Sequence, residues 1–199
     1  MLVVRKRRGL YDNAPSTSIQ LLLDYKIAGQ YLHPIVIDYL SNLRARSLLT
    51  TYDAVTDKLT HRPITVVCSG RCLLEDVLGQ QPRDIFFDAP LDKLDSFQYG
   101  PEVSPLASAS LKKLFGSWGS GDLNEGRMKK IRPMLESANM RGIKTRFYDG
   151  PTYVPTSTLS QVLELARSLH RHVFQIAIAG HHAFATLCGR SSNSQVSIL

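Results

Sequence analysis

The sequence predicts an α/β protein with a parallel sheet, and three observations support this fold class. Short runs of β-branched and aromatic residues alternate with longer amphipathic segments. Three of the four strand candidates are apolar on both faces, as in the buried strands of parallel sheets, and the fourth repeats the pattern of a strand followed by Asp and then Pro. Each candidate also ends on polar or turn-forming residues. With 199 residues and 43% hydrophobic content, the chain is long enough to bury a sizeable core.

The strands and helices follow one another in a simple order. The predicted strands are Ile19–Tyr25, Ile64–Cys68, Asp84–Phe87 and Lys144–Tyr148. Apolar residues at helical spacing predict helices at Leu32–Ser47, Leu73–Leu78, Leu123–Met140 and Leu159–Leu169. The segment 96–121 is rich in Ser, Gly and Pro, so we expect a long loop that carries a short strand or helix. From Gln175 an apolar run leads into a Ser-rich tail, which is expected to fray over residues 190–199.

Charge and hydropathy constrain the class of protein. The net charge is +7, but four of the positive charges lie in the run Arg5–Arg8, so the remainder is only mildly basic. A solvated terminal run is the simpler interpretation, and contact with an anionic membrane or nucleic acid stays the alternative. The start is too short for a signal peptide, and no stretch reaches the ~20 apolar residues of a membrane span. We therefore expect neither feature in these residues and leave the compartment open.

The cysteines indicate no disulfide framework. Their number is odd and their spacing sparse, at Cys68, Cys72 and Cys188. Cys68 follows an apolar run and is expected to be a small buried hydrophobic residue.

Polar residues directly after the strands are the candidates for chemistry, because ligands of parallel α/β folds bind beyond the carboxyl ends of the strands. These residues are Asp24, Lys26, Ser69, Asp88 and Asp149. Carboxylates that converge at one end of a barrel repel one another unless a cation or a positive side chain neutralises them, which is why such clusters commonly hold Mg²⁺ or Ca²⁺. Alternatively, each Asp caps a helix or fixes a turn, and for Asp88 and Asp149, which precede prolines, both interpretations remain open. Asp24 and Lys26 are two residues apart, so in a strand they point to the same side.

The histidines carry no recognisable pattern of a metal or catalytic site. His170 and His172 end an amphipathic helix, and His181 and His182 lack a Cys or Glu at ligand spacing. His33 and His61 adjoin prolines and are expected in turns. A structural or surface role is predicted for all six histidines. The chain also lacks a glycine-rich phosphate loop, a nucleophile elbow, a CxxC pair and an HExxH motif.

Five blocks of sequence together resemble a known family. They are Leu21–Lys26 with Gly29, Pro63–Gly70, Phe86–Leu91, Ala107–Ser110 and Arg146–Pro151. In this order and spacing they are similar to the fungal altered inheritance of mitochondria protein 6 family, over about residues 9 to 165. That family is placed in the phospholipase C-like phosphodiesterase superfamily, with the glycerophosphodiester phosphodiesterases and sphingomyelinase D.

The resemblance implies a fold, a reaction and a set of site residues. The expected fold is a partial TIM-type (β/α) barrel, about the last five of eight strand–helix units, over residues 9–189, between a basic run at 1–8 and the tail at 190–199. The implied activity is that of a phosphoric diester hydrolase of lipid or glycerophosphodiester metabolism, with a phosphodiester or phospholipid as substrate and Mg²⁺ or another divalent cation as cofactor. Asp24 would be a metal ligand and Lys26 a phosphate-facing cation. The other substrate-binding candidates are Ser69, Asp88, Tyr148 and Asp149.

The chain also departs from the family pattern. The strands that carry the family's catalytic histidines would precede residue 9, so those histidines are expected to be missing. Arg71 stands where the family tends to have Asn, and the family's last strand is not recognisable in residues 172–189. We therefore expect a truncated product that is weakly active or inactive, or else a non-catalytic remnant that binds an anionic membrane or nucleic acid through its basic run. If the chain is a truncated phosphodiesterase, we expect no nucleic acid as a partner. The oligomeric state is left open.

Overall fold

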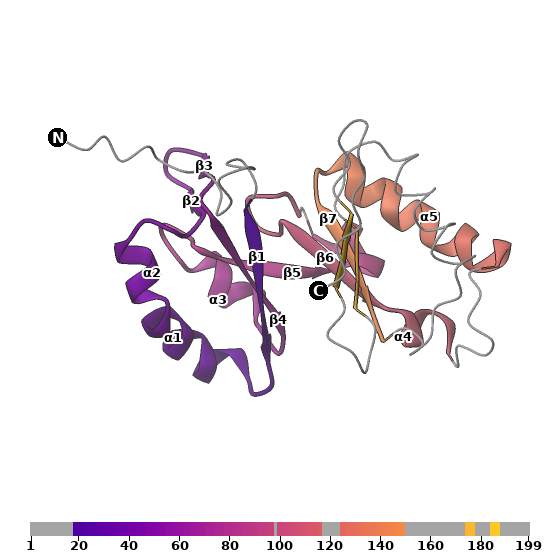
Figure 1. The fold of residues 1–199 in the computed structure, drawn as a ribbon, viewed down its shortest axis with the longest axis horizontal. Coiled ribbons are helices and arrows are strands. Elements are labelled where there is room, and N and C mark those ends of the chain that lie inside the picture. Colours follow the sequence, from indigo (N-terminus) through magenta and orange to yellow (C-terminus); the bar gives the residue numbers. More distant parts are fainter. Residues whose placement is uncertain (1–17, 98, 117–123, 150–173, 178–183, 188–199) are drawn as a thin grey trace. The chain divides into compact units, whose positions relative to one another are not determined.

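The computed structural model describes residues 18–97, 99–116, 124–149, 174–177 and 184–187 (Figure 1). The chain divides into two compact units. The first contains residues 1–88 and 102–105, and the second contains residues 89–101 and 106–199. The boundary therefore falls inside a strand, between Asp88 and Ala89.

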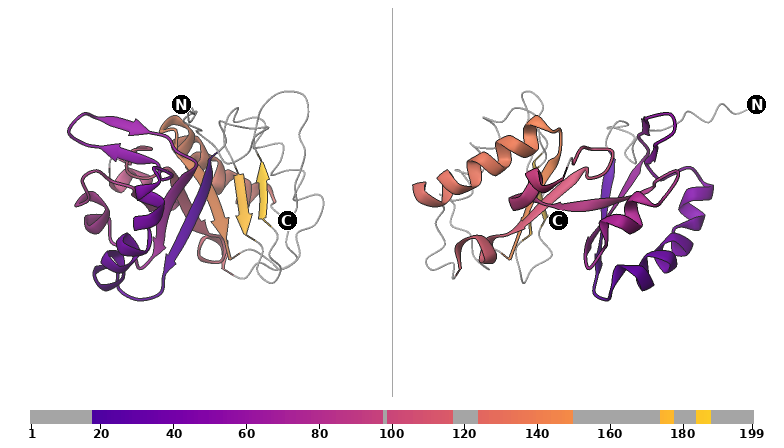
Figure 2. Two further views of the ribbon diagram at one scale, coloured as in Figure 1. Left: turned by 60° about the vertical axis from the view of Figure 1, so that its left-hand side comes forward. Right: turned by 180° about the vertical axis from the view of Figure 1, so that it is seen from behind.

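The first unit is built on parallel strands. Strand β4 (Ile64–Gly70) lies between β1 (Ile19–Tyr25) and β5 (Ile85–Pro90) and pairs in parallel with both. A short antiparallel hairpin, β2 (Thr51–Asp53) and β3 (Lys58–Thr60), lies outside this sheet (Figure 2). Because the strands are parallel, their carboxyl ends meet at one edge, where polar side chains of different strands become neighbours.

Three helices cover one face of this sheet. They are α1 (Gly29–Tyr39), α2 (Ser41–Ala45) and α3 (Leu74–Leu78). Between helices and strands lies a buried cluster made of Tyr25, Leu40, Leu49, Val66, Cys68, Cys72, Val77 and Ile85. Side chains alternate along a strand, so the residues next to these strand members point to the opposite face. Asp24, Ser69 and Asp88 are on that second face.

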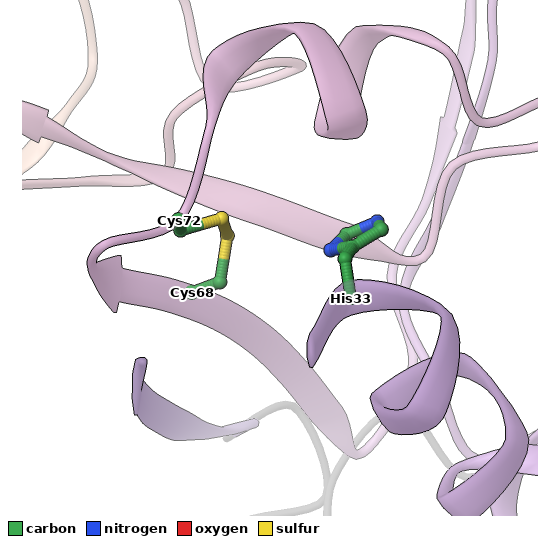
Figure 3. A group of neighbouring side chains, drawn as sticks. All are labelled: His33, Cys68 and Cys72. Atoms are coloured by element: carbon green, nitrogen blue, oxygen red, sulfur yellow. A yellow bond between two sulfur atoms is a disulfide. The ribbon is translucent and has the colours of Figure 1, made fainter. Parts of the chain in front are cut away.

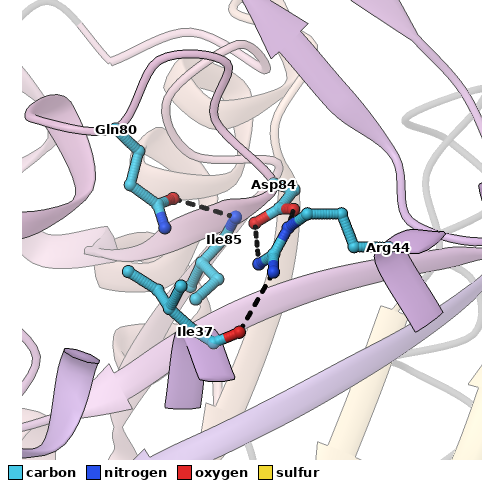
Figure 4. Close-up of polar contacts among 5 residues, drawn as sticks. All are labelled: Ile37, Arg44, Gln80, Asp84 and Ile85. Atoms are coloured by element: carbon cyan, nitrogen blue, oxygen red, sulfur yellow. Dashed lines mark hydrogen bonds and ion pairs between the residues drawn. The ribbon is translucent and has the colours of Figure 1, made fainter. Parts of the chain in front are cut away.

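An ion pair holds the helices to the start of β5 (Figure 4). The Arg44 guanidinium donates two hydrogen bonds to the two carboxylate oxygens of Asp84, at 2.5 and 3.1 Å. It donates a third to the carbonyl oxygen of Ile37, at 3.1 Å. The Asp84 side chain is only 5% exposed, and this contact raises the pKa of Arg44 above its usual value. One side chain of α2 thus links α1, α2 and the residue before β5.

The second unit carries another set of parallel strands. Strands β6 (Leu106–Ser110), β7 (Lys144–Tyr148) and β8 (Phe174–Ala177) pair in parallel, and β9 (Phe184–Leu187) pairs antiparallel with β8. A 3₁₀ segment (Leu91–Ser96) and α4 (Leu111–Phe115) accompany them. Helix α5 (Glu125–Met140) leads into β7 and buries Ile131, Leu135 and Ala138, which lie on one of its faces at helical spacing.

The α/β class and the parallel pairing are confirmed. Strands β1 and β7 occupy the predicted residues, whereas β4 and β5 extend beyond their predicted ends. The segment 96–121 does contain a strand and a helix, β6 and α4. The prediction of one helix over Leu32–Ser47 was wrong, because the chain turns at the buried Leu40 and forms two helices. The predicted helix Leu159–Leu169, the run 1–8 and the tail 190–199 lie outside the described residues.

Two side-chain predictions need correction. His33 is not in a turn but in α1, where it is 4% exposed. Cys68 is buried as expected, yet it is not a free thiol, because it forms a disulfide with Cys72. In the described part of the chain, no helix is long and apolar enough to cross a membrane.

Candidate functional site

Asp24 and Lys26 form an ion pair where β1 ends. Asp24 is the sixth residue of the strand, and the Lys26 Nζ contacts its Oδ2 from just beyond the strand end. Their side chains are 51% and 83% exposed, respectively. The pair is therefore open to a ligand, and it combines a carboxylate that could bind a metal ion with an ammonium group that could meet a phosphate oxygen.

Gly70 allows the Asp24 carboxylate to occupy its position. Gly70 ends β4 with a φ of 71°, and it lies opposite Tyr25 in the parallel register. A Cβ at this residue would lie well inside 3.0 Å of Asp24 Oδ1 and 2.6 Å from the carbonyl oxygen of Tyr25. Only glycine tolerates both this backbone conformation and so close an approach.

Ser69 and Asp88 continue the same edge of the sheet. Asp24 lies opposite Ser69 in the β1–β4 register, and the Ser69 hydroxyl donates a hydrogen bond of 2.6 Å to Asp88 Oδ2 on β5. Three neighbouring strands thus place Asp24, Ser69 and Asp88 in a row. At the usual strand spacing of ~4.8 Å, the backbones of the two aspartates lie roughly 10 Å apart, with the serine between them.

The second unit repeats this serine–aspartate arrangement. Ser110 ends β6, and its hydroxyl donates a hydrogen bond of 2.8 Å to Oδ2 of Asp149, directly after β7. The same hydroxyl accepts a hydrogen bond of 3.1 Å from the Lys113 amide and so caps α4. Tyr148, the last residue of β7, has the Arg146 guanidinium 5.2 Å from its ring centre. In both units, a serine at one strand end binds an aspartate at the next.

The two aspartates differ in backbone conformation. Asp88 lies within β5, so the turn, one of the two interpretations left open for it, is wrong. Asp149 has a φ of 53° in a bend after β7, as a turn-forming residue would. The structure thus brings Asp24, Lys26, Ser69 and Asp88 to one edge of the first unit, and Tyr148 and Asp149 to the strand ends of the second.

The donor atoms at the first edge suit a hard cation. Carboxylate and hydroxyl oxygens are the ligands that Mg²⁺ prefers, so Asp24 and its neighbours fit in kind. Among the described residues, however, these acidic groups do not assemble into a cluster of three. The one such cluster in this part of the chain consists of His33, Cys68 and Cys72.

Neither described histidine reaches this edge. His33 packs beside Cys68, on the helix-covered face of the sheet opposite to Asp24. His61 precedes β4, at the far end of that strand from Ser69. Both are therefore excluded as an acid or base acting beside Asp24.

Sequence reasoning missed two features of this region. The first is Gly70, which was noted only as part of the end of β4, although a polar side chain followed by glycine at a strand end is a signal for close packing. The second is the contact of His33 with Tyr25 and the two cysteines. The adjoining Pro34 suggested a turn, and helix periodicity over Leu32–Ser47 was the competing signal.

Comparison with known proteins finds one family model and several relatives, and each matches only part of this chain. The family model described as the AIM6-like phosphodiesterase domain matches residues 2–88. A protein of Arthroderma benhamiae named altered inheritance of mitochondria protein 6 homolog is 29% identical over 148 residues, which cover 73% of this chain and 46% of the relative. The protein of that name from Lachancea thermotolerans is 27% identical, over 75% of this chain and 40% of the relative.

A Saccharomyces cerevisiae protein with the same name is 26% identical, over 74% of this chain and 43% of the relative. The chain thus spans less than half the length of these curated relatives. No solved structure matches it. The comparisons support the resemblance to the altered inheritance of mitochondria protein 6 family.

Proposed function

We propose that this chain is part of a metal-dependent, phosphodiesterase-like (β/α) barrel that binds a phosphodiester of the glycerophosphodiester or phospholipid class. The observation that carries the proposal is the open Asp24–Lys26 pair at the carboxyl end of β1, beside Ser69 and Asp88 on the next two strands. The matching domain model, which covers this part of the chain, names a phosphodiesterase domain. Parallel strands in each unit agree with a barrel of TIM type.

Each residue has a distinct role in this proposal. Asp24 holds the divalent cation, which would polarise a phosphoryl oxygen and offset its charge when bound. Lys26 supplies a point charge to the phosphate. The Ser69–Asp88 hydrogen bond fixes the neighbouring strand end and offers polar atoms to the substrate.

Tyr148, Asp149 and Ser110 are the corresponding candidates in the second unit. The Ser110–Asp149 hydrogen bond orients the Asp149 carboxylate, and Tyr148 is the last residue of β7, directly before Asp149. Their role in binding substrate rests on the family resemblance and on their strand-end positions.

The test separates metal binding from phosphodiester binding. Thermal unfolding is measured with and without 10 mM Mg²⁺ for the wild type, Asp24→Asn, Lys26→Met and a matched control, Asp95→Asn, whose side chain is 88% exposed and paired with Arg141. For a dissociation constant of about 1 mM, Mg²⁺ stabilises the wild type by about 1.4 kcal/mol, or a few degrees. Asp24→Asn removes that increment, whereas Lys26→Met and the control keep it.

Phosphodiester binding is then measured by titration with glycerophosphocholine in the presence of Mg²⁺. Lys26→Met is expected to weaken this binding while it preserves the response to Mg²⁺. If Mg²⁺ stabilises Asp24→Asn as much as the wild type, or if neither responds, the assignment of the metal to Asp24 is wrong.

A further inference from the structure

A second group of potential ligands lies on the other face of the same strand. A ring nitrogen of His33 and the sulfur atoms of Cys68 and Cys72 all lie within 4.8 Å of one another (Figure 3). The three residues are 4%, 0% and 8% exposed, respectively. They come from α1, from β4 and from the turn after β4, so the fold rather than local sequence brings them together.

One atom of this group is buried without a partner. The phenol oxygen of Tyr25 is 3.1 Å from Nδ1 of His33, a hydrogen bond that engages one ring nitrogen. The other nitrogen, Nε2, is buried and has no hydrogen-bond partner among the described residues. A buried polar atom left in this way is destabilising, so a native structure needs a reason to keep it. A metal ion bound by the imidazole of His33 would be such a reason.

We propose that, once the Cys68–Cys72 disulfide is reduced, His33, Cys68 and Cys72 bind one Zn²⁺ ion. Two thiolates and one imidazole suit Zn²⁺, whereas Mg²⁺ and Ca²⁺ prefer oxygen ligands. Tetrahedral zinc with bonds of about 2.3 Å to sulfur needs its ligand atoms about 3.8 Å apart. The three ligand atoms lie within 4.8 Å of one another, and after reduction the two sulfur atoms, bonded in the disulfide, must move about 2 Å further apart to complete the geometry.

The surroundings of the site favour a cation and hold its histidine. Ligating histidines usually have their second ring nitrogen fixed by a hydrogen bond, and Tyr25 provides this for His33. Asp76 places a negative charge close enough to act on both Tyr25 and His33, and its own Oδ2 is buried without a hydrogen-bond partner in the described chain. A cation bound there would offset the charge of Asp76, although burial has the larger effect on His33 and lowers its pKa.

Disulfide and zinc are mutually exclusive states of the same two sulfur atoms. A dithiol reductant donates two electrons to the disulfide, its own thiols become a disulfide, and Cys68 and Cys72 become thiols. Binding of Zn²⁺ then releases the two thiol protons as two zinc–sulfur bonds form. In both states, Cys68 stays linked to Cys72, and the loop that carries Ser69 and Gly70 stays closed. The zinc site is thus a crosslink with three protein ligands and one open position, separate from the Asp24 site on the opposite face.

The test begins with the wild-type chain in two redox states. The chain is reduced with a phosphine, titrated with Zn²⁺ against a chromophoric chelator, and titrated in parallel with Co²⁺ to record thiolate-to-cobalt charge-transfer absorption. We expect one equivalent of metal per reduced chain, a charge-transfer band, and a higher midpoint of thermal unfolding with zinc. The oxidised chain should show none of these effects.

Variants then identify the ligands. His33→Ala and Cys72→Ser should each weaken zinc binding at least about 100-fold, and Tyr25→Phe, which removes only the supporting hydrogen bond, about 10-fold to 100-fold. The matched controls are His61→Ala and Cys188→Ser, which should bind zinc like the wild type.

Three results would overturn the proposal: a reduced wild type without stoichiometric zinc, a cobalt complex without thiolate charge transfer, or undiminished binding by His33→Ala. The measurements on the wild type need no substitution, so they test the proposal even where a variant fails to fold. The response to Mg²⁺ of Asp24→Asn is independent of these measurements, so the two proposals can fail separately.

Discussion

Gly70 and Asp24 are in direct contact across two paired strands, and the contact leaves no room for a Cβ. The Asp24 carboxylate lies over the Gly70 backbone, which has a φ of 71°. The position of the candidate metal ligand therefore depends on a residue that has no side chain. This dependence can be tested without any knowledge of the substrate.

Gly70→Ala is expected to destabilise the first unit and to displace Asp24. The positive φ alone costs an alanine about 1–2 kcal/mol, and the collision with Asp24 and the Tyr25 carbonyl adds to this. Urea unfolding should give a loss of about 2–4 kcal/mol, and stabilisation by Mg²⁺ should be lost.

Gly116→Ala is the matched control for backbone strain. Gly116 has the same φ of 71°, but no atom of the described residues lies within 4 Å of the position that a Cβ would occupy there. Gly116→Ala should lose only the stability that backbone strain costs, and its stabilisation by Mg²⁺ should be unchanged. Equal losses in the two variants would show that the contact with Asp24 has no energetic weight.

Removal of Arg44 should be one of the most damaging single changes in the first unit. Arg44→Met leaves the Asp84 carboxylate buried and without its bidentate partner. The loss of one member of a buried pair typically costs about 3–5 kcal/mol, and since Arg44 is itself partly exposed we expect about 2–4 kcal/mol. Arg44→Lys should recover only part of this, because lysine cannot make the two-pronged contact.

Arg141→Met is the control for that experiment. Arg141 also pairs with an aspartate, Asp95, but the Asp95 side chain is 88% exposed. An exposed pair contributes only about 0–1 kcal/mol, so the change should be small. If both arginine variants lose the same stability by chemical denaturation, burial of Asp84 is not the deciding factor.

The sequence predicts elements well where composition alone determines burial. Strands β1 and β7 were placed to the residue, β1 because it is a long apolar run and β7 because it repeats the pattern of a strand followed by Asp and then Pro. Strand β6 (LASAS) was not assigned, since its residues are small and lack the β-branched side chains of a typical strand. It is buried at every position, so tertiary packing overrides its weak propensity.

The candidate site was predictable only in part, for a similar reason. Strand-end logic places Asp24, Lys26, Ser69 and Asp88 at one edge, because parallel strands align their ends. It does not reveal which side chains form pairs, such as Ser69 with Asp88, since these depend on register. The Cys68–Cys72 contact depends on the turn at Gly70, and a cysteine count contains no information about that turn.

Ser110→Ala should weaken the strand end of the second unit. The hydroxyl, on a residue that is 3% exposed, both caps α4 and donates to Asp149. A lost cap costs about 1 kcal/mol, and a lost hydrogen bond to a carboxylate about 1.5–3 kcal/mol, so we expect a total of about 2.5–4 kcal/mol by urea unfolding. In the control Ser96→Ala, an exposed hydroxyl that donates to the Lys93 carbonyl is removed, and the loss should stay below about 1 kcal/mol. Similar losses in both variants would contradict a special role for Ser110.

Tyr25 should make the protein sensitive to alkaline pH. Burial, and to a lesser extent the charge of Asp76, raises the pKa of Tyr25 from 10.0 to about 12. Between these two values, an unfolded chain releases the phenol proton while the folded chain retains it. Stability from this group is therefore complete below about pH 10 and is lost progressively as the pH rises towards 12, by at most about 3 kcal/mol.

The measurement is urea unfolding of the wild type, Tyr25→Phe and Tyr39→Phe at several pH values from about 8 to about 12. Tyr25→Phe starts from a lower stability at the neutral end, because it loses the hydrogen bond to His33, but its stability should decline less steeply above about pH 10. Tyr39, which is 83% exposed, serves as the control, and its variant should decline like the wild type. Because lysine deprotonation is common to all three proteins, the difference in slope isolates Tyr25. Parallel curves for wild type and Tyr25→Phe would show that the buried phenol titrates like an exposed one, and that the core around Cys68 and His33 admits water.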